Sequence, residues 1–192
     1  MNEKSVVSNV CVYGFDDSVR AAKYPKATDI SKLNAEITPG ISSLGDAEIG
    51  SGHDNFLNGI VVQFDLNFTI KAWTEAERYH FLDFVSSQST MHKITKFDID
   101  EQCNEYVISE IKFLLKALVN RYNEDPTPEN YLTILYNVPV GFRLTARMTT
   151  NYRQLKTIYA QRKNHRLPEW REFCKWIVSL PCSGWLAGEI PD

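Results

Sequence analysis

The clearest pattern along the chain is the alternation of apolar and polar residues between Ile60 and Ile70. Apolar side chains at every second position share one face of an extended segment, which predicts a half-buried strand. A shorter strand is expected over residues 6–13. The remaining residues up to about 50 are rich in Pro, Gly, Ser, Asp and Asn, and predict loops with at most short helices. The apolar face of the main strand comprises Val62, Phe64, Leu66, Phe68 and Ile70.

Helical patterns dominate the rest of the chain. Thr74 precedes two glutamates in an expected first turn, which predicts a helix that begins there and continues through Val85 to a polar run at residues 86–90. A long amphipathic helix is expected from about Asp100 to Tyr122. Shorter helices are expected over residues 129–136, 151–161 and 168–179, the last with a proline in its first turn.

Length and composition predict one ordinary α/β domain. The chain has 192 residues, of which 43% are hydrophobic and 23% charged, and it contains no recognisable linker or repeat. We therefore expect a single domain over residues 1–192, with an irregular part at 1–50 and a core at 51–180. No apolar run approaches the roughly 20 residues that span a bilayer, and residues 1–5 lack the apolar stretch of a signal peptide, so a cytoplasmic protein is expected.

The cysteines and histidines do not predict a metal site. The four cysteines are scattered along the chain without Cys-x-x-Cys spacing, which favours reduced, partly buried thiols. The four histidines also lie far apart in the sequence and lack the spacing of metal ligands.

Positive charge is concentrated in residues 143–175 of a chain whose formal net charge is -3. In this segment many lysines and arginines face only Glu169 and Glu172. A local excess of positive charge suggests a partner that carries phosphates, whereas a solvated helix face would explain the same residues.

Two segments around the main strand combine residue types that bind phosphate or polar rings. Residues 51–57 place His53 and Asn55 beside a glycine just ahead of the strand. Residues 78–92 join Arg78 and His80 to a run of hydroxyl and amide side chains. A capped helix turn and a serine-rich helix end would explain these two segments without any ligand.

A third such segment lies in the basic region. Asn151 and Arg153 begin it, and Arg162 and Arg166 follow. On a helix, Asn151 and Arg162 are about three turns apart, so both side chains can line one side of a groove. An asparagine among arginines is typical of a site that binds a phosphorylated, hydrogen-bonding ring compound.

Taken in order, these segments resemble the three motif regions of the flavin-dependent thymidylate synthases. The resemblance rests on Gly52-His53-Asp54, on residues 86–91, and on Pro139 followed by Asn151-x-Arg153 and Arg162. It implies an α/β fold of the α+β type, with a small, mostly antiparallel sheet packed with helices. It also implies a homotetramer that binds FAD between subunits and methylates dUMP with methylene-tetrahydrofolate and NADPH.

The resemblance also assigns roles to individual residues. Glu75 stands where the family usually has Gln, and Met91 and Leu135 replace two arginines that would contact the nucleotide. Ser89 and Arg162 are the implied catalytic residues. The implied flavin contacts are His53, Asn55, Arg78, His80, Asn151, Arg153 and Arg166, and the implied substrate contacts are Glu75, Ser87, Gln88, Ser89 and Arg162.

Three functions are therefore open at the level of sequence. The first is a divergent flavin-dependent thymidylate synthase, and the second is a non-catalytic nucleotide-binding protein with the same fold. The third is a protein whose basic helix contacts RNA or DNA. The negative net charge and the absence of an aromatic and basic stacking surface in the sequence disfavour the third function.

Overall fold

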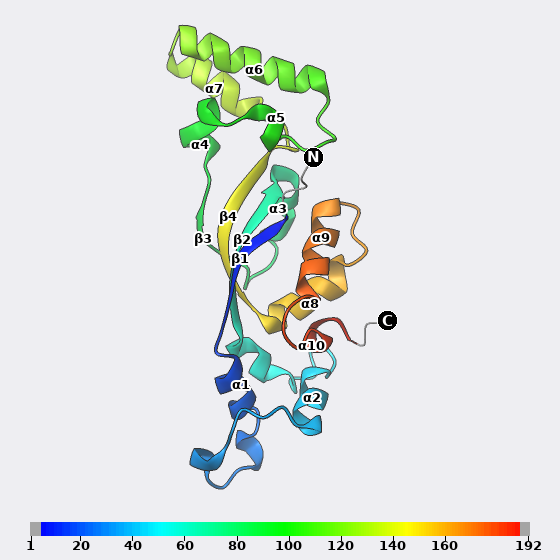
Figure 1. Ribbon diagram of the computed structural model, residues 1–192. Helices are drawn as coiled ribbons and strands as arrows, with labels where there is room; N and C mark the ends of the chain where they lie inside the picture. Colours follow the sequence, from blue (N-terminus) through cyan, green and yellow to red (C-terminus); the bar gives the residue numbers. More distant parts are fainter. Residues whose placement is uncertain (1–4, 189–192) are drawn as a thin grey trace.

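The computed structural model describes residues 5–188 and shows an elongated molecule (Figure 1). A four-stranded sheet forms its centre, a helical hairpin lies beyond one end of the sheet, and short helices of the N-terminal part lie beyond the other. The polar N-terminal run considered for a signal peptide lies, except for Ser5, outside the described residues.

The sheet is antiparallel throughout, with strand order β1-β2-β4-β3. β2 and β4 form its centre and pair from Val61 opposite Asn151 to Thr69 opposite Arg143. A small antiparallel sheet packed with helices is the predicted fold class, and the structure confirms it. The strands are β1 (Val7–Tyr13), β2 (Val61–Thr69), β3 (Asp83–Ser87) and β4 (Arg143–Asn151).

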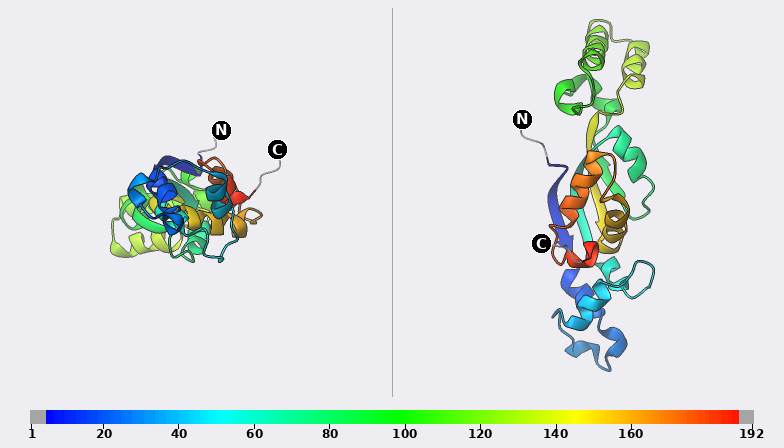
Figure 2. Two further views of the ribbon diagram at one scale, coloured as in Figure 1. Left: turned by 90° about the horizontal axis from the view of Figure 1, so that it is seen from below. Right: turned by 90° about the vertical axis from the view of Figure 1, so that its right-hand side faces the viewer.

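The apolar face of β2 forms the main core, as the alternation predicted. Helices α8 (Tyr152–Arg162) and α9 (Pro168–Ile177), both expected from the sequence, cover this face of the sheet (Figure 2). The ring of Phe68 lies 4.9 Å from that of Trp170 in α9. Burying one such aromatic side chain contributes about 1.5–3 kcal/mol. Val62, Phe64, Leu66 and Phe68 are fully buried, whereas Ile70 is the first residue of the next helix.

That helix, α3 (Ile70–Ala76), starts earlier than predicted. Thr69, and not Thr74, is its N-cap, and its hydroxyl accepts a hydrogen bond from the Ala72 N–H. The same buried hydroxyl donates to Glu169 at 2.7 Å. The glutamates that suggested a first turn at Thr74 therefore lie at the other end of the helix, because the end of β2 fixes where the helix begins.

The expected continuation of this helix through Val85 is wrong, because the chain turns back and residues 83–87 form β3. All five β3 side chains are exposed, so this edge strand carries no alternating apolar pattern. β4 was not predicted either. Its buried residues include Ala146, Met148 and Thr150, and they alternate with partly exposed polar or charged residues of the basic segment. Pairing with β2 across the sheet makes this segment a strand.

A second core lies in the region of the helical hairpin. The predicted helix from Asp100 to Tyr122 is two helices, because residues 103–107 leave the helix to meet the start of β4. There the Asn104 N–H donates to the Gly141 carbonyl, and Cys103 pairs with Phe142. The predicted helix at 129–136 is confirmed. The elements of this region are α4 (Thr90–Lys93), η4 (Ile94–Lys96), α5 (Ile99–Gln102), α6 (Ser109–Glu124) and α7 (Pro128–Tyr136).

The N-terminal part is β1 followed by short helices, as predicted. The ring of Phe15 stacks on that of Trp185 at 5.8 Å, which attaches this part to the C-terminal helix. Gly45 packs so closely there that an added Cβ would lie 2.4 Å from the Trp185 ring. The elements are α1 (Phe15–Ala21), η1 (Tyr24–Lys26), η2 (Ile30–Lys32), α2 (Pro39–Gly45), η3 (Asn55–Gly59) and α10 (Gly184–Ala187).

The cysteines are free thiols, as expected. Cys103 and Cys174 are buried, Cys182 is partly buried, and Cys11 is exposed. Burial raises the pKa of the Cys174 thiol to about 12. Across residues 5–188 there is no cluster of three potential metal-binding side chains, and no helix is both long and apolar enough to cross a bilayer.

Candidate functional site

Three segments with candidate flavin contacts meet at one end of the sheet. Because the strands are antiparallel, the start of β2, the start of β3 and the end of β4 lie together. Residues 51–57 precede β2, the loop with Arg78 and His80 precedes β3, and Asn151 ends β4. The Thr150 hydroxyl donates to the Phe81 carbonyl, which fastens the second of these segments to the third.

A buried carboxylate joins two of these segments. Asp54 is fully buried, with its Oδ1 3.2 Å from Arg153 Nε and its Oδ2 3.5 Å from Lys156 Nζ. Neither Asp54 oxygen accepts a hydrogen bond within residues 5–188, so the two cations hold the carboxylate mainly by charge. We refer to His53, Asp54, Asn55, Asn151 and Arg153 as the strand-end cluster.

Lys156 extends this connection to the N-terminal part. It is buried, and its ammonium donates to the Gly45 carbonyl at 2.8 Å and to the Ala47 carbonyl. The sequence interpretation assigned no role to Asp54 or Lys156. The signal for Asp54 was its place in the Gly52-His53-Asp54 motif, whereas nothing in the sequence pairs Lys156 with that motif.

Asn151 is the N-cap of α8. Its Oδ1 accepts a hydrogen bond from the Gln154 N–H at 2.8 Å, and its NH₂ group is the part that can donate to a ligand. Arg162 lies at the opposite end of α8. Eleven residues of helix correspond to about 16 Å, so Asn151 and Arg162 lie in different clusters of side chains, and their sharing one groove stays a prediction.

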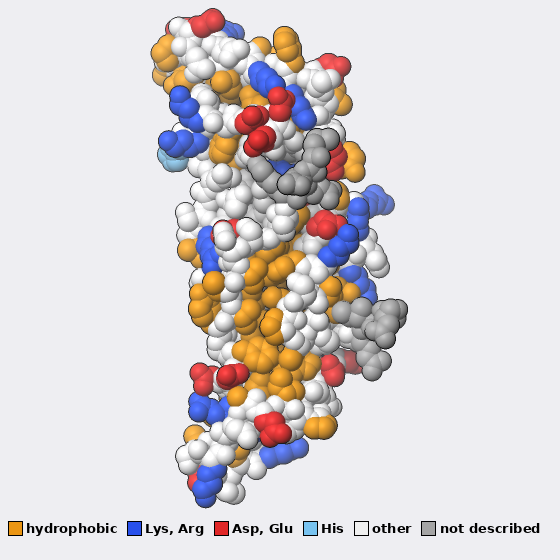
Figure 3. Space-filling model, viewed as in Figure 1, with side chains coloured by type: hydrophobic (Ala, Val, Ile, Leu, Met, Phe, Trp, Pro, Cys, Tyr) orange, Lys and Arg blue, Asp and Glu red, His pale blue; other side chains and the backbone are white. Residues whose placement is uncertain are grey.

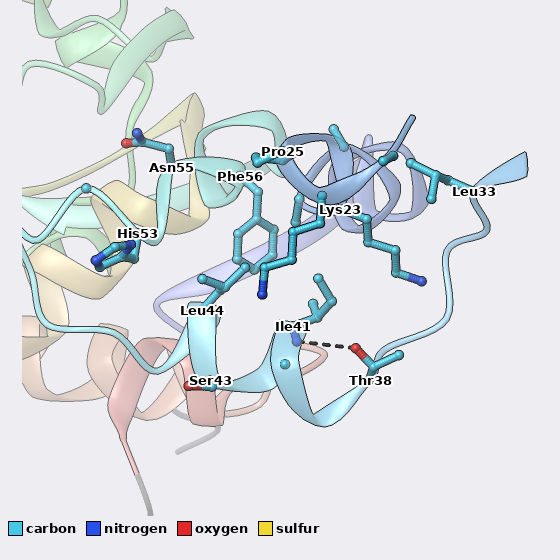
Figure 4. A pocket seen from close by; sticks show the side chains of 16 residues that line it. Lys23, Pro25, Leu33, Thr38, Ile41, Ser43, Leu44, His53, Asn55 and Phe56 are labelled. Carbon is cyan, nitrogen blue, oxygen red and sulfur yellow. Dashed lines mark hydrogen bonds between the residues drawn. The ribbon is translucent and has the colours of Figure 1, made fainter. Parts of the chain in front are cut away.

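His53 and Asn55 lie at the edge of a large cavity of about 950 Å³ (Figure 4). Phe56 and α2 form much of its wall, and the segment from α1 to η2 faces them. A largely apolar cavity with a few polar groups at its edge is typical of small-molecule sites, and this volume falls in their usual range. The other side chains in its wall include Lys23, Pro25, Leu33, Ile41 and Leu44.

A second cluster surrounds Glu75 on α3. Glu75 Oε2 lies 2.9 Å from Arg162 Nη1 and 3.0 Å from His165 Nε2, and its Oε1 lies 2.9 Å from Lys71 Nζ. Arg162 also donates from Nε to the Tyr79 hydroxyl at 2.7 Å. We refer to Lys71, Glu75, Tyr79, Arg162 and His165 as the Glu75 cluster.

Arg162 is enclosed as well as paired. Its guanidinium lies 4.9 Å from the centre of the Trp170 ring and 5.5 Å from that of Tyr79, and its side chain is only 12% exposed. Glu75 and Arg162 are both predicted substrate contacts, and in the structure they form an ion pair with each other. From the sequence, no contact role was assigned to Tyr79, His165 or Trp170, although Tyr79 and His165 lie within the predicted segments.

The charges in this cluster shift two pKa values. Burial opposes ionisation of Glu75, but Lys71, His165 and Arg162 outweigh it and lower the pKa of its carboxyl. Burial, together with Arg162, lowers the pKa of His165 despite the nearby Glu75. Because His165 Nδ1 accepts a hydrogen bond from the Leu167 N–H, Nε2 carries the proton of the neutral ring and donates to Glu75.

The remaining substrate candidates lie on another face of α3. Ser87 and Gln88 line a cavity of about 240 Å³ with Trp73, Thr74 and Glu77. These α3 residues recur at helical spacing, and Lys71 and Glu75 lie on a different face of the helix. Within one chain, the Ser87–Gln88 cavity and the Glu75 cluster are therefore separate.

The polar side chains in and next to this smaller cavity differ in whether their hydrogen-bonding groups are available to a ligand. The Gln88 Oε1 accepts a hydrogen bond from the Thr145 N–H at 2.9 Å, which commits this oxygen to β4. Ser89 precedes α4, and its carbonyl accepts from His92 and Lys93. Its hydroxyl makes no capping hydrogen bond in the described part of the chain, so it is available to a ligand. Met91 is exposed, and Leu135 packs against the second core.

Acidic residues from elsewhere in the chain neutralise much of the basic segment. Arg143 pairs with Glu105, and Arg147 pairs with Asp65. Asp54 pairs with Arg153 and Lys156, and Glu75 pairs with Arg162. Arg78, His80 and Arg166 are exposed. Much of the positive charge of this segment is therefore paired with carboxylates of the same chain.

Comparison with solved structures identifies the fold. Two crystal structures of the flavin-dependent thymidylate synthase ThyX from Helicobacter pylori, both with FAD and dUMP, match with TM-scores of 0.68 and 0.71. Each is 14% identical, and each match covers 95% of this chain and 98% of that chain. This chain has the ThyX fold. No family model and no curated protein sequence matches it.

The match covers nearly the full length of both chains, so the ThyX-like fold includes the N-terminal short helices and the helical hairpin as well as the sheet. At 14% identity the likeness concerns the fold alone. The chemistry of this chain has to be argued from its own side chains.

Proposed function

We propose that this protein is a flavin-dependent thymidylate synthase-like protein that binds FAD and methylates dUMP with methylene-tetrahydrofolate and NADPH. The observation that carries the proposal is the strand-end cluster beside the large cavity, in a chain with the ThyX fold. The cluster gathers His53, Asn55, Asn151 and Arg153, all implied flavin contacts, from segments distant in the sequence.

The residues around the cavity fit a flavin. Its apolar wall suits a planar ring system, and Lys23, Lys26, His53 and Asn55 supply polar groups at its edge. Arg153, one third exposed beside the buried Asp54, is positioned to attract a diphosphate. When bound, FAD supplies the redox chemistry of the reaction. The side chains of this chain bind and orient it, with Arg78, His80 and Arg166 as exposed polar residues that complete the contact set.

We further propose that the substrate site forms between copies of the chain, in a homo-oligomer that we expect to be a tetramer. Within one chain Ser87 and Gln88 are separated from Arg162 by α3, so a nucleotide that contacts both requires residues from two copies. The large solvent-accessible surface of the single chain supports this proposal. Its area is 11686 Å² for a chain of 22.1 kDa, whereas a compact monomer of this mass exposes about 9,300 Å².

Exposed apolar residues are available for such contacts. The face shown in Figure 3 carries an apolar band between β1 and α10. Elsewhere, the helical hairpin exposes Phe113 and Tyr136 to 75% and 87%. Apolar surface of this extent favours association.

Ser89 and Arg162 are the residues of this chain that we assign to the reacting nucleotide. Ser89 offers a free hydroxyl beside the cavity of Ser87 and Gln88. Arg162 offers positive charge to the nucleotide, but its ion pair with Glu75 reduces this attraction.

A non-catalytic nucleotide-binding protein is the second candidate. The observation that favours it is the engagement of Arg162 by Glu75, together with Met91 and Leu135 at positions where arginines would contact the nucleotide. These features weaken anion binding without altering the fold.

An absorbance spectrum before and after incubation with FAD tests the proposal. We expect the bands of bound flavin, and about fivefold weaker FAD binding in His53→Ala, because one hydrogen bond contributes about 1 kcal/mol. His92→Ala, which changes an exposed histidine on α4, is the matched control and should bind FAD normally.

A turnover assay then separates the two candidates. Thymidylate formed from dUMP, methylene-tetrahydrofolate and NADPH would support the enzyme. Nucleotide binding by a protein that takes up no FAD would instead support the second candidate and contradict the first.

A further inference from the structure

The Glu75 cluster contains the arginine proposed to contact the nucleotide, but a carboxylate already occupies that arginine. Glu75 Oε2 lies 2.9 Å from Arg162 Nη1, and the Tyr79 hydroxyl accepts from Arg162 Nε. The rings of Tyr79 and Trp170, which meet edge to face, both contact the guanidinium and hold it in place. A ligand can therefore reach Arg162 only where Glu75 leaves room.

Charge decides which ligands tolerate this arrangement. Lys71 and Arg162 carry positive charge, Glu75 carries negative charge, and the lowered pKa of His165 keeps its ring neutral near pH 7. A phosphate that approaches Arg162 meets a fixed carboxylate 2.9 Å from the same nitrogen, so repulsion by Glu75 offsets much of the attraction by Arg162. An uncharged ligand is far less affected by this pairing.

We propose that Glu75 is a specificity-determining residue that lowers the affinity of the site for the phosphate of a nucleotide and leaves its affinity for the uncharged nucleoside unchanged. The inference rests on the proposed function, because the nucleotide site is the one that contains Arg162. It adds that an ion pair inside the fold, between Glu75 and Arg162, weakens the contribution of the phosphate to dUMP binding.

The test compares dUMP with deoxyuridine by titration calorimetry in the wild type and in Glu75→Gln. Glutamine keeps the size and the hydrogen-bonding oxygen of Glu75 but removes the charge. We expect dUMP to bind roughly tenfold more tightly to the variant, from the loss of one negative charge several ångströms from a phosphate, and deoxyuridine to bind equally to both. Circular dichroism establishes that the variant is folded.

Two further variants assign the gain to Arg162. Glu129→Gln removes an equal charge from exposed α7, remote from the site, and should leave dUMP binding unchanged. Adding Arg162→Gln to Glu75→Gln should abolish the gain, because the released guanidinium is its source.

Equal dUMP affinity in the wild type and Glu75→Gln, or an equal gain for deoxyuridine, would overturn the inference. Inorganic phosphate separates this failure from that of the proposed function. If no protein binds dUMP or deoxyuridine, the proposed function is wrong. Tighter phosphate binding by Glu75→Gln would then still support the role of Glu75, and unchanged phosphate binding would overturn that role too.

Discussion

Asp54 and Glu75 each hold two or more cations, but they differ in burial and in what the pairing leaves free. Asp54 is fully buried and pairs with Arg153 and Lys156 from inside the protein. The Arg153 side chain remains 33% exposed, so part of it still faces solvent. Glu75 is itself 15% exposed and pairs with Arg162, the residue that we propose contacts the nucleotide. A carboxylate on the buried side of an arginine orients the guanidinium and leaves its exposed side able to bind an anion. A carboxylate that pairs with the nitrogen facing the ligand competes with the anion for that nitrogen.

The two regions also differ in how much of the fold depends on them. The Asp54 carboxylate connects the loop before β2, the first turns of α8 and, through Lys156, the end of α2. The Glu75 cluster connects α3 with the end of α8 and the loop before α9. We therefore expect Asp54 to matter most for stability and Glu75 to matter most for ligand choice.

The largest expected effect is that of Asp54→Ala. Removing this carboxylate leaves Lys156 buried without its countercharge, and breaking a buried pair in this way costs about 3–5 kcal/mol. Urea unfolding measures the loss, and FAD binding should weaken with it. Asp46→Ala, an exposed aspartate next to α2, is the control and should change the free energy of unfolding by less than about 0.5 kcal/mol. A loss no larger than that of the control would contradict the connecting role of Asp54.

Gly45→Ala tests the same region from the α2 side. The added methyl would lie 2.4 Å from the Trp185 ring, and overpacking of this kind costs about 1–3 kcal/mol. Thermal unfolding should show the decrease. Gly40→Ala in the same helix meets only the Thr38 hydroxyl at 3.8 Å, so it should be neutral or slightly stabilising. Equal effects of the two substitutions would show that α2 is loosely attached.

The Glu75 cluster should make stability depend on pH. The pKa of Glu75 is lowered from 4.5 and that of His165 from 6.5, so in both cases the unfolded chain takes up a proton first as the pH falls. Stability is therefore expected to decrease below pH 6.5, and to decrease again as the pH falls through 4.5 toward the lowered pKa of Glu75.

Urea midpoints measured across this pH range check the expectation. Glu75→Gln should flatten the lower step and His165→Gln the upper one, each by less than the effect of Gly45→Ala. An unchanged pH profile in both variants would mean that the cluster does not couple protonation to folding.

The smallest effect belongs to an ordinary surface pair. Lys175 and Glu172 are 2.6 Å apart but 72% and 50% exposed, and such pairs contribute less than about 1 kcal/mol. Lys175→Gln should therefore change the urea midpoint only within error. A loss comparable to that of Gly45→Ala would show that exposed pairs in the basic segment carry more weight than their burial indicates.

Local patterns in the sequence determined several elements and the identity of the motifs. The alternation over Ile60–Ile70 identified β2 and its buried face, because period-two burial is a property of one segment. The Pro, Gly, Ser, Asp and Asn content of the N-terminal part predicted loops with at most short helices, without placing any helix, and helical patterns identified α7, α8 and α9. The resemblance drawn from the motifs agreed with the fold that the comparison found.

The tertiary structure decided the rest, because it depends on pairing between distant segments. β3 and β4 are strands through their ladders across the sheet, and the contact of residues 103–104 with 141–142 interrupts the long helix. Arg162 looks like a free phosphate ligand in the sequence, yet Glu75, 87 positions earlier, takes its Nη1. Sequence spacing reports which side chains share a segment, whereas the free energy of a charged group depends on the neighbours that folding places around it.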